Sequence, residues 1–311
     1  MQGGDDISWS ELCRIAGLWA GESAGLAEVV PLQGGSVSTT LLLKTKDGRK
    51  AVCKITPHRV DRGVIGEAHQ LAVLASLGIP VPKVYAAELA SLEQPNSFLL
   101  MEHVDGVTLA EAKRHMTPEM YAGLQVEFAE IVSRLHDQTA DVYGKCDSPA
   151  TAPDQPDWPT FFRELNDSAV EGVRQHHGIP IKLRKKIDKL HDRIDRFVAH
   201  NDRPRLLHGD CWSGNVLCHL NGDGRWHVAA VLDPSLRYGH AEYELAYMDL
   251  FETTTRDFRR AYHARHHADE AYHRVRKPIY QLYPLMHHVN AFGDRYVPAV
   301  VKAAEAATAV V

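Results

Sequence analysis

The chain has 311 residues, which favours about two domains or lobes. Its 44% hydrophobic and 24% charged residues are typical of a globular protein, and its net charge of −5 gives no reason to expect a nucleic-acid partner. No apolar run approaches the ~18 residues of a membrane span, and the polar start MQGGDDISWSELC lacks the features of a signal peptide. We therefore expect a cytoplasmic protein without a membrane partner.

The first third of the chain predicts a small sheet with one helix after its hairpin. Residues 39–55 predict two short strands joined at Asp47-Gly48, a dipeptide typical of hairpin turns. Residues 64–77 have helical spacing and Gly78 suits the end of that helix. Residues 79–89 and 97–104 predict two further strands.

Beyond residue 104 the pattern becomes helical. Thr117 followed by Pro118 predicts the start of a long helix, and residues 180–200 predict another with one apolar stripe. That stripe contains Leu183, Ile187, Leu190, Ile194 and Phe197. A proline-rich loop covers about 147–159, and the chain from 241 onward is expected to be mostly helical.

A small strand-rich front half followed by a larger helical back half predicts an α+β, two-lobed, protein-kinase-like fold. Residues 1–103 would form an antiparallel-sheet N-lobe that binds nucleotide in the cleft between the lobes. Residues 104–311 would form the helical C-lobe, with the catalytic and acceptor-binding groups.

The most polar motif of the back half is LLHGDCWSGNVLC, residues 206–218, between two strand-like runs. Phosphoryl transfer needs an acid that positions the attacking hydroxyl and takes its proton, and two oxygen ligands for Mg²⁺. Asp210 fits the first role. Asn215, five residues later, and Asp233, at the end of a second strand-like run, fit the metal ligands. His208 is expected to brace the loop.

The front half offers groups that could hold ATP. Lys54 on the second hairpin strand and Glu67 on the following helix have the order of the paired lysine and glutamate of kinases. Glycine backbone can approach phosphates closely, which suits a phosphate-covering loop before the first predicted strand. The backbone at the end of the strand that should link the lobes is a candidate to bind adenine. The phosphate-covering loop would be Gly34-Gly35-Ser36, and the adenine-binding backbone would be Glu102-His103-Val104.

HGDCWSGN, residues 208–215, resembles the HGDLWSGN signature of the fructosamine kinase (ketosamine kinase) family. The WSGN part distinguishes that family from the related aminoglycoside phosphotransferases. The similarity continues through residues 231–251 and resumes at 280–296, which carry the family's His-x-Asn-x-Phe-Gly pattern. The resemblance implies a protein-kinase-like fold, ATP, Mg²⁺ and phosphorylation of the 3-hydroxyl of a ketosamine, the sugar adduct of an amine.

Carried over residue by residue, the resemblance makes Asp210 the base and Asn215 and Asp233 the metal ligands. It also makes Lys54 and Glu67 the phosphate-orienting pair. Trp212 would be a platform for the sugar, and His288 of the tail pattern would contribute to acceptor binding.

Several alternatives stay open. His240 stands where the family often has aspartate, and the segment 142–162 departs from the family, so the acceptor could be a fructosamine, a ribulosamine or an aminoglycoside. A catalytically inactive kinase-like binding module is an alternative of another class. The G-x-S-x-G stretch Gly21–Gly25 matches serine hydrolases, and His263 and His267 have metal-ligand spacing.

The cysteines offer a last candidate. The chain has five, with no CxxC pair, which is typical of reduced thiols in a cytosolic protein. Cys211 lies inside the polar motif and is the one whose reactivity is worth testing.

Overall fold

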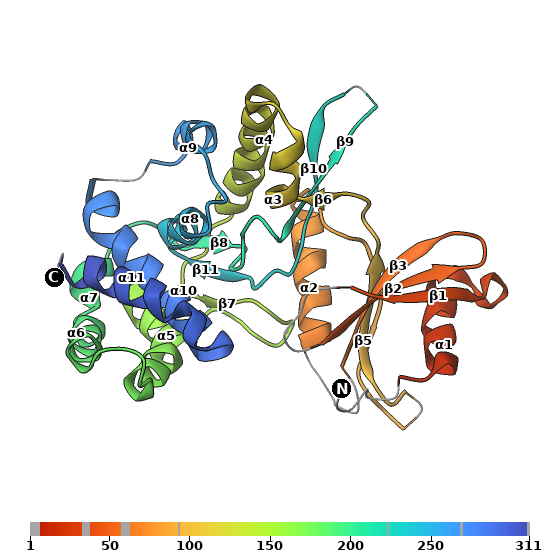
Figure 1. The fold of residues 1–311 in the computed structure, drawn as a ribbon, viewed down its shortest axis with the longest axis horizontal. Coiled ribbons are helices and arrows are strands. Elements are labelled where there is room, and N and C mark those ends of the chain that lie inside the picture. The colour runs from red at the N-terminus through yellow and green to blue at the C-terminus, as the bar shows by residue number, and fades with distance from the viewer. Residues whose placement is uncertain are drawn as a thin grey trace. The chain divides into compact units, whose positions relative to one another are not determined.

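The computed structural model describes residues 7–32, 38–56, 63–92, 94–222, 224–267 and 270–309 (Figure 1). The predicted phosphate loop, Gly34-Gly35-Ser36, lies outside these residues. The chain divides into two compact units, which we call the sheet unit and the helical unit. The sheet unit comprises Met1–Val107, Asp147–Thr151 and Val216–Ser235. The helical unit comprises Thr108–Cys146, Ala152–Asn215 and Leu236–Val311.

An antiparallel sheet with the order β1-β2-β3-β5-β4 forms the centre of the sheet unit within the described residues. Its strands are β1 (Leu26–Pro31), β2 (Thr39–Thr45), β3 (Lys50–Thr56), β4 (Val84–Glu88) and β5 (Ser97–Glu102). The predicted hairpin at Asp47-Gly48 is confirmed, and Gly48 adopts the left-handed φ of 85° that the turn requires. β1 was not predicted.

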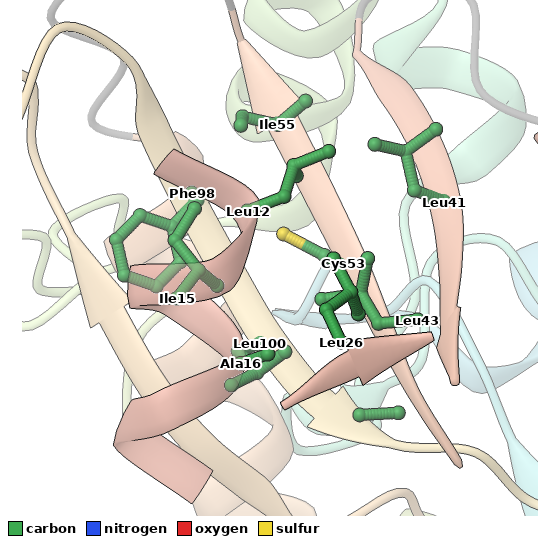
Figure 2. Close-up of a cluster of buried hydrophobic side chains, with 11 residues drawn as sticks. Leu12, Ile15, Ala16, Leu26, Leu41, Leu43, Cys53, Ile55, Phe98 and Leu100 are labelled. Carbon is green, nitrogen blue, oxygen red and sulfur yellow. The ribbon is translucent and has the colours of Figure 1, made fainter. Parts of the chain in front are cut away.

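Helices α1 (Trp9–Ala20) and α2 (Gly63–Ser76) cover opposite faces of this sheet. Leu12 and Ile15 of α1 pack against Cys53, Ile55 and Leu100 (Figure 2). On α2, buried Val64 and Leu71 instead pack against Leu99 and Met101. Because successive strand residues point to opposite faces, the face that buries Cys53 and Ile55 cannot take Lys54, which therefore projects toward α2.

The sheet unit also takes in a later hairpin of β9 (Val216–Leu220) and β10 (Trp226–Val231), in a sheet of order β10-β9-β6 with β6 (Val107–Thr108). The Val231 N–H donates to the Pro80 carbonyl at 2.8 Å, which ties the end of β10 to the loop before β4. This division assigns Asp233 to the same unit as Lys54 and Glu67. The expected lobe boundary at residues 103 and 104 stays a prediction.

The helical unit contains long helices and a small sheet of order β7-β11-β8. Its elements are α3 (Leu109–Ala112), α4 (Pro118–His136), β7 (Gly144–Lys145), α5 (Trp158–Gln175), α6 (Ile181–Asp192), α7 (Asp195–Val198), β8 (Arg205–Leu207), β11 (Arg237–Gly239), α8 (Ala241–Leu250), α9 (Arg256–His263), α10 (Lys277–Phe292) and α11 (Val297–Ala309). The predicted cap is confirmed: the Thr117 hydroxyl accepts from the Met120 N–H.

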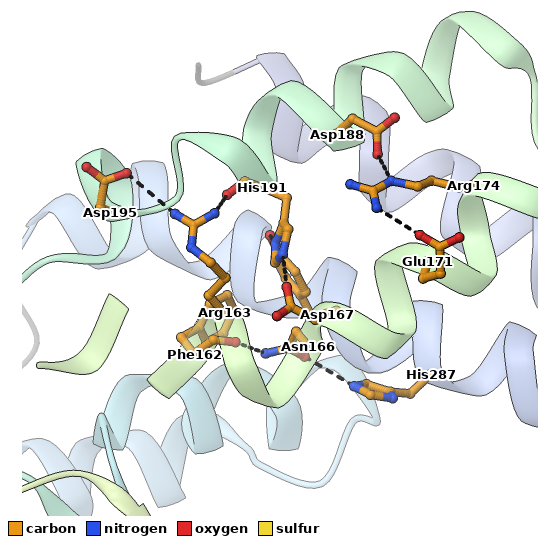
Figure 3. A network of polar contacts seen from close by, with 11 residues as sticks. Phe162, Arg163, Asn166, Asp167, Glu171, Arg174, Asp188, His191, Asp195 and His287 are labelled. Atoms are coloured by element: carbon orange, nitrogen blue, oxygen red, sulfur yellow. Dashed lines mark hydrogen bonds and ion pairs between the residues drawn. The ribbon is translucent and has the colours of Figure 1, made fainter. Parts of the chain in front are cut away.

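The predicted continuous helix over 180–200 is wrong. α6 ends at Asp192 and a separate short helix, α7, follows, so Val198 is buried while Phe197 is only half-buried. Polar contacts with α5 hold this region, as Figure 3 shows: Arg174 bonds Asp188 at 2.7 Å, and Arg163 donates to the carbonyl of His191 at the end of α6. No helix of the described residues is both long and apolar enough to cross a bilayer.

Candidate active site

Lys54, Glu67 and Asp233 meet in the sheet unit. The Lys54 Nζ lies 2.6 Å from a Glu67 carboxylate oxygen and also contacts the Asp233 carboxylate. Lys54 and Glu67 are largely buried, whereas the Asp233 side chain is 43% exposed. One ammonium therefore contacts two carboxylates, and of these only Asp233 is exposed to solvent to a large extent.

The local backbone explains why these groups converge. Glu67 follows Gly66, where a Cβ would stand 2.7 Å from the Asp147 carbonyl oxygen, so glycine lets α2 pack closely on that segment. The Gln70 side chain donates to the same carbonyl at 3.0 Å. Asp233 has a φ of 55°, an uncommon conformation for a residue other than glycine and one that recurs at functional sites.

The two carboxylates keep the Lys54 side chain protonated and positively charged. Burial by itself would lower the pKa of Lys54, but the charges of Glu67 and Asp233 outweigh burial and raise it. Burial raises the pKa of Glu67, partly offset by Lys54. In this arrangement the ammonium supplies the positive charge beside Asp233 that a metal ion could supply instead. Hard carboxylate oxygens are ligands that Mg²⁺ prefers, so Asp233 fits that group.

The loop after β8, residues 208–215, contains the predicted base Asp210 and the predicted metal ligand Asn215, and we call it the catalytic loop. The Asn215 amide donates to the Asp210 carbonyl and to Asp210 Oδ2, both at 2.9 Å. That donation leaves Asn215 Oδ1 as its acceptor atom, and an amide oxygen also suits Mg²⁺. Gly209 has a φ of 84°, which allows the sharp turn before Asp210. The Asp210 N–H points to His208 Nδ1 at 3.4 Å, consistent with His208 as a brace.

Glu244, a buried residue of α8 that the sequence did not single out, binds the backbone of this loop. The Glu244 carboxylate accepts from the backbone N–H groups of His208 at 3.1 Å and Gly209 at 2.6 Å. Its Oε2 also bonds His136 Nε2 at 2.9 Å. Burial would raise the pKa of Glu244, but these partners lower it, so the carboxylate stays ionised. Only a contact across 35 residues of sequence reveals this role.

Tyr247, one turn further along α8, is a second residue that the sequence did not single out. Its hydroxyl donates to Asp210 Oδ1. Burial, followed by the Asp210 charge, raises the pKa of Tyr247, so the hydroxyl keeps its proton. Asp210 is therefore oriented through both oxygens, by Tyr247 on Oδ1 and by Asn215 on Oδ2.

Trp212 presents an aromatic surface two residues after Asp210. Its side chain is 39% exposed, and its indole packs on the backbone of Gly214, where any Cβ would overlap the ring. The glycine of the WSGN stretch thus decides the orientation of the tryptophan. Cys211 is buried and burial raises its pKa well above the ordinary value, so it lacks the thiolate that reactivity requires.

The comparisons with known proteins agree across the chain. The model of the fructosamine kinase family matches residues 9–308. The chain belongs to this family.

A relative from Enterococcus faecium, named a probable ketoamine kinase, is 31% identical over 278 residues, covering 86% of this chain and 91% of the relative. The solved structure of a candidate fructosamine-3-kinase from Haemophilus somnus 129PT has a TM-score of 0.73 at 24% identity, covering 96% of both chains. A thermostable mutant of aminoglycoside phosphotransferase APH(4)-Ia with AMP-PNP and hygromycin B has a TM-score of 0.69 at 16% identity, covering 96% and 98%. The two structures confirm the two-lobed kinase-like α+β fold.

Membership of the fructosamine kinase family makes the chain a phosphotransferase that acts on a hydroxyl group. In the family's His-x-Asn-x-Phe-Gly pattern, Asn290 and His288 make different contacts. Asn290 donates to the Ala169 carbonyl at 3.0 Å and packs on Gly172, where a Cβ would overlap its amide, so it joins α10 to α5. His288 instead bonds its own helix, at Pro284, and its ring lies 5.2 Å from that of Phe251.

The predicted adenine-binding backbone is only partly available. The Glu102 N–H already donates to the Lys83 carbonyl at 2.8 Å, so Glu102 could offer only its carbonyl oxygen. The Val104 N–H makes no backbone hydrogen bond within the described part of the chain. An acceptor on one residue and a donor two residues later suit the amino group and ring nitrogen of a purine.

Two other sequence hypotheses lose their support. Gly21–Gly25 follows a helix and leads into β1, the reverse of the strand–turn–helix order that a serine hydrolase needs. His263 bonds the His266 carbonyl, and no cluster of metal-ligating groups in the described residues includes it. The structure itself brings together one further group, which the sequence did not suggest. His200, Asp202 and His240 have ligand atoms within 4.8 Å of one another, but the two imidazoles stack at 3.5 Å, so their in-plane lone pairs do not converge.

Proposed function

We propose that this chain transfers the γ-phosphoryl group of ATP to a sugar hydroxyl, the 3-hydroxyl of a ketosamine. One observation carries the proposal: Asp210 is held through both carboxylate oxygens and lies two residues from the exposed Trp212. A sugar ring stacked on the indole can turn a hydroxyl toward a carboxylate that is already oriented.

The chemical step follows from these groups. The acceptor hydroxyl gives its proton to Asp210 while its oxygen forms a bond to the γ-phosphorus, and the bond from that phosphorus to the ADP oxygen breaks. Asn215 and Tyr247 keep the carboxylate in place, so little reorganisation is needed when the proton moves. Asp233 and Asn215 are the residues assigned to magnesium, which would neutralise charge that develops on the phosphates.

The sheet unit supplies the nucleotide groups in this proposal. Lys54 is assigned to the phosphates, with Glu67 to orient it, since the buried ion pair fixes the ammonium. The backbone of Glu102 and Val104 is assigned to adenine, and the glycine-containing loop Gly34-Gly35-Ser36 to the phosphates. Alternative acceptors with several ammonium groups are less favoured, because Asp294, the one acid of the tail pattern, is 91% exposed and already pairs with His176 at 3.4 Å.

The test compares Asp210→Asn with wild type and with Asp192→Asn, an exposed carboxylate on α6. ATP turnover is measured with fructoselysine, a ribulosamine and kanamycin as acceptors, and nucleotide binding is measured separately. Loss of a general base typically costs ~10² to 10⁴ in rate, so Asp210→Asn should bind ATP but lose turnover. Turnover of Asp210→Asn within about threefold of wild type would overturn the base assignment. Absence of any acceptor-dependent turnover in wild type would favour the inactive binding module.

A further inference from the structure

A series of aromatic rings extends from the catalytic loop to the end of α10. The Trp212 and Tyr247 rings lie 6.5 and 4.9 Å from the ring of Phe251. Phe251 lies 5.2 Å from His288, which in turn contacts Phe292 at 5.5 Å. We call Trp212, Phe251, His288 and Phe292 the aromatic row.

The aromatic row differs from an ordinary helix core. His288 and Phe292 are four residues apart on α10, a spacing that often marks a buried stripe. On α10, however, the buried side chains include Leu285, Met286 and Val289, and Phe292 is 44% exposed. Since Trp212 is exposed at the other end, both ends of the row are open to solvent and aromatic surface remains for a ligand.

The row is also connected to the reacting group. Tyr247, which contacts Phe251, donates its hydroxyl to Asp210. Trp212 lies two residues after Asp210. A ligand whose hydroxyl meets Asp210 and whose ring lies on Trp212 therefore has the rest of the row beside it.

The distal end of the row carries a positive charge. The Arg295 guanidinium lies 5.4 Å from the ring centre of Phe292 and 5.1 Å from that of Tyr296. No carboxylate pairs with Arg295 among the residues that the structure describes. A second ammonium group on a ligand that reached Phe292 would meet the guanidinium of Arg295.

We propose that the aromatic row beyond Trp212, formed by Phe251, His288 and Phe292, binds the amine substituent of the ketosamine, and that it selects a substituent with an aromatic ring and no second ammonium group. This inference rests on the proposed function, because the substituent reaches the row only if the reacting sugar hydroxyl lies at Asp210. In a ketosamine the amine is on C1 and the reacting hydroxyl is on C3, so the substituent leaves the sugar close to the reacting carbon. Stacking on the rings then adds affinity beyond simple burial.

The test uses three adducts of one sugar: the fructosyl adducts of benzylamine, butylamine and 1,4-diaminobutane. In wild type we expect kcat/KM to be about five- to tenfold higher for the benzylamine adduct than for the butylamine adduct, and lowest for the diaminobutane adduct. Phe292→Leu keeps apolar volume without a ring and should reduce the benzylamine preference to about twofold or less. Ile181→Ala, at a 62% exposed apolar side chain of α6, is the control and should keep the preference.

Binding without ATP, measured by calorimetry, separates the two proposals. Equal kcat/KM for the three adducts, or an unchanged preference in Phe292→Leu, overturns the aromatic row while the kinase function stands. A benzylamine preference in binding that Phe292→Leu removes, without turnover of any adduct, supports the row and overturns the proposed reaction. Absence of binding of all three adducts overturns both.

Discussion

Replacing Glu244 with glutamine tests whether the buried carboxylate positions the catalytic loop. In wild type it accepts the N–H groups of His208 and Gly209 and bonds His136. A glutamine amide has one oxygen, so in either orientation its NH₂ group faces a backbone N–H and at least one bond is lost. Each bond to a charged group is worth about 1.5–3 kcal/mol, which gives a loss of about 2–4 kcal/mol in unfolding free energy.

Taking about 2 °C per kcal/mol for a chain of this size, Glu244→Gln should lower Tm by about 4–8 °C. It should also lower kcat by about 10- to 100-fold, because a small displacement of the loop moves Asp210. Thermal unfolding and steady-state kinetics at a temperature where the variant is folded measure both effects.

Glu242→Gln is the matched control on the same helix. Glu242 is buried and pairs with Arg276 at 2.5 and 2.9 Å, so its loss should also destabilise the fold. Among the described residues its carboxylate has no hydrogen bond or ion pair with the catalytic loop. We expect kcat of Glu242→Gln within about threefold of wild type. If both variants lost kcat equally, or if Glu244→Gln kept wild-type kcat, the reasoning about Glu244 would be refuted.

The Tm difference between wild type and Glu244→Gln should depend on pH, and the direction follows from the pKa of Glu244. The folded-state pKa of Glu244 is depressed, so its contribution to stability is fully present above the unfolded-state value of about 4.3. The contribution disappears as the pH falls from there through the folded-state pKa. The Tm difference between wild type and Glu244→Gln should therefore shrink below about pH 4. A difference that grows on acidification would contradict the ionised state of Glu244.

Three further predictions concern the nucleotide and acceptor groups. Asp233→Ala should raise the Mg²⁺ concentration needed for half-maximal rate and nearly abolish turnover, and Asn215→Ala should do so less severely; an unchanged metal titration would remove Asp233 from the metal site. Lys54→Met should raise KM for ATP or lower kcat without changing acceptor KM, and a selective loss of acceptor binding would contradict its role. Gly214→Ala should displace the Trp212 indole, raise acceptor KM by about 2- to 10-fold, spare KM for ATP and shift tryptophan fluorescence; unchanged fluorescence and KM would show that the indole keeps its place.

Local signals explain which elements could be predicted. The Asp47-Gly48 turn and the Thr117 cap each depend on a few neighbouring residues, and both are confirmed. The helix over 180–200 was predicted as continuous because Phe197 continues the apolar spacing. In the fold α6 ends earlier and Val198 is buried instead, so tertiary packing overrides the local pattern.

The sequence by itself determined the family and the spacing of Asp210, Asn215 and Asp233, because these residues lie in motifs that local backbone geometry preserves. Only the tertiary structure decided what orients them. Tyr247 reaches Asp210 across 37 residues, and Lys54 reaches Asp233 across 179. Such contacts depend on how helices and strands pack, and a tyrosine or glutamate on α8 carries no local signal that distinguishes a support of the catalytic loop from an ordinary core residue.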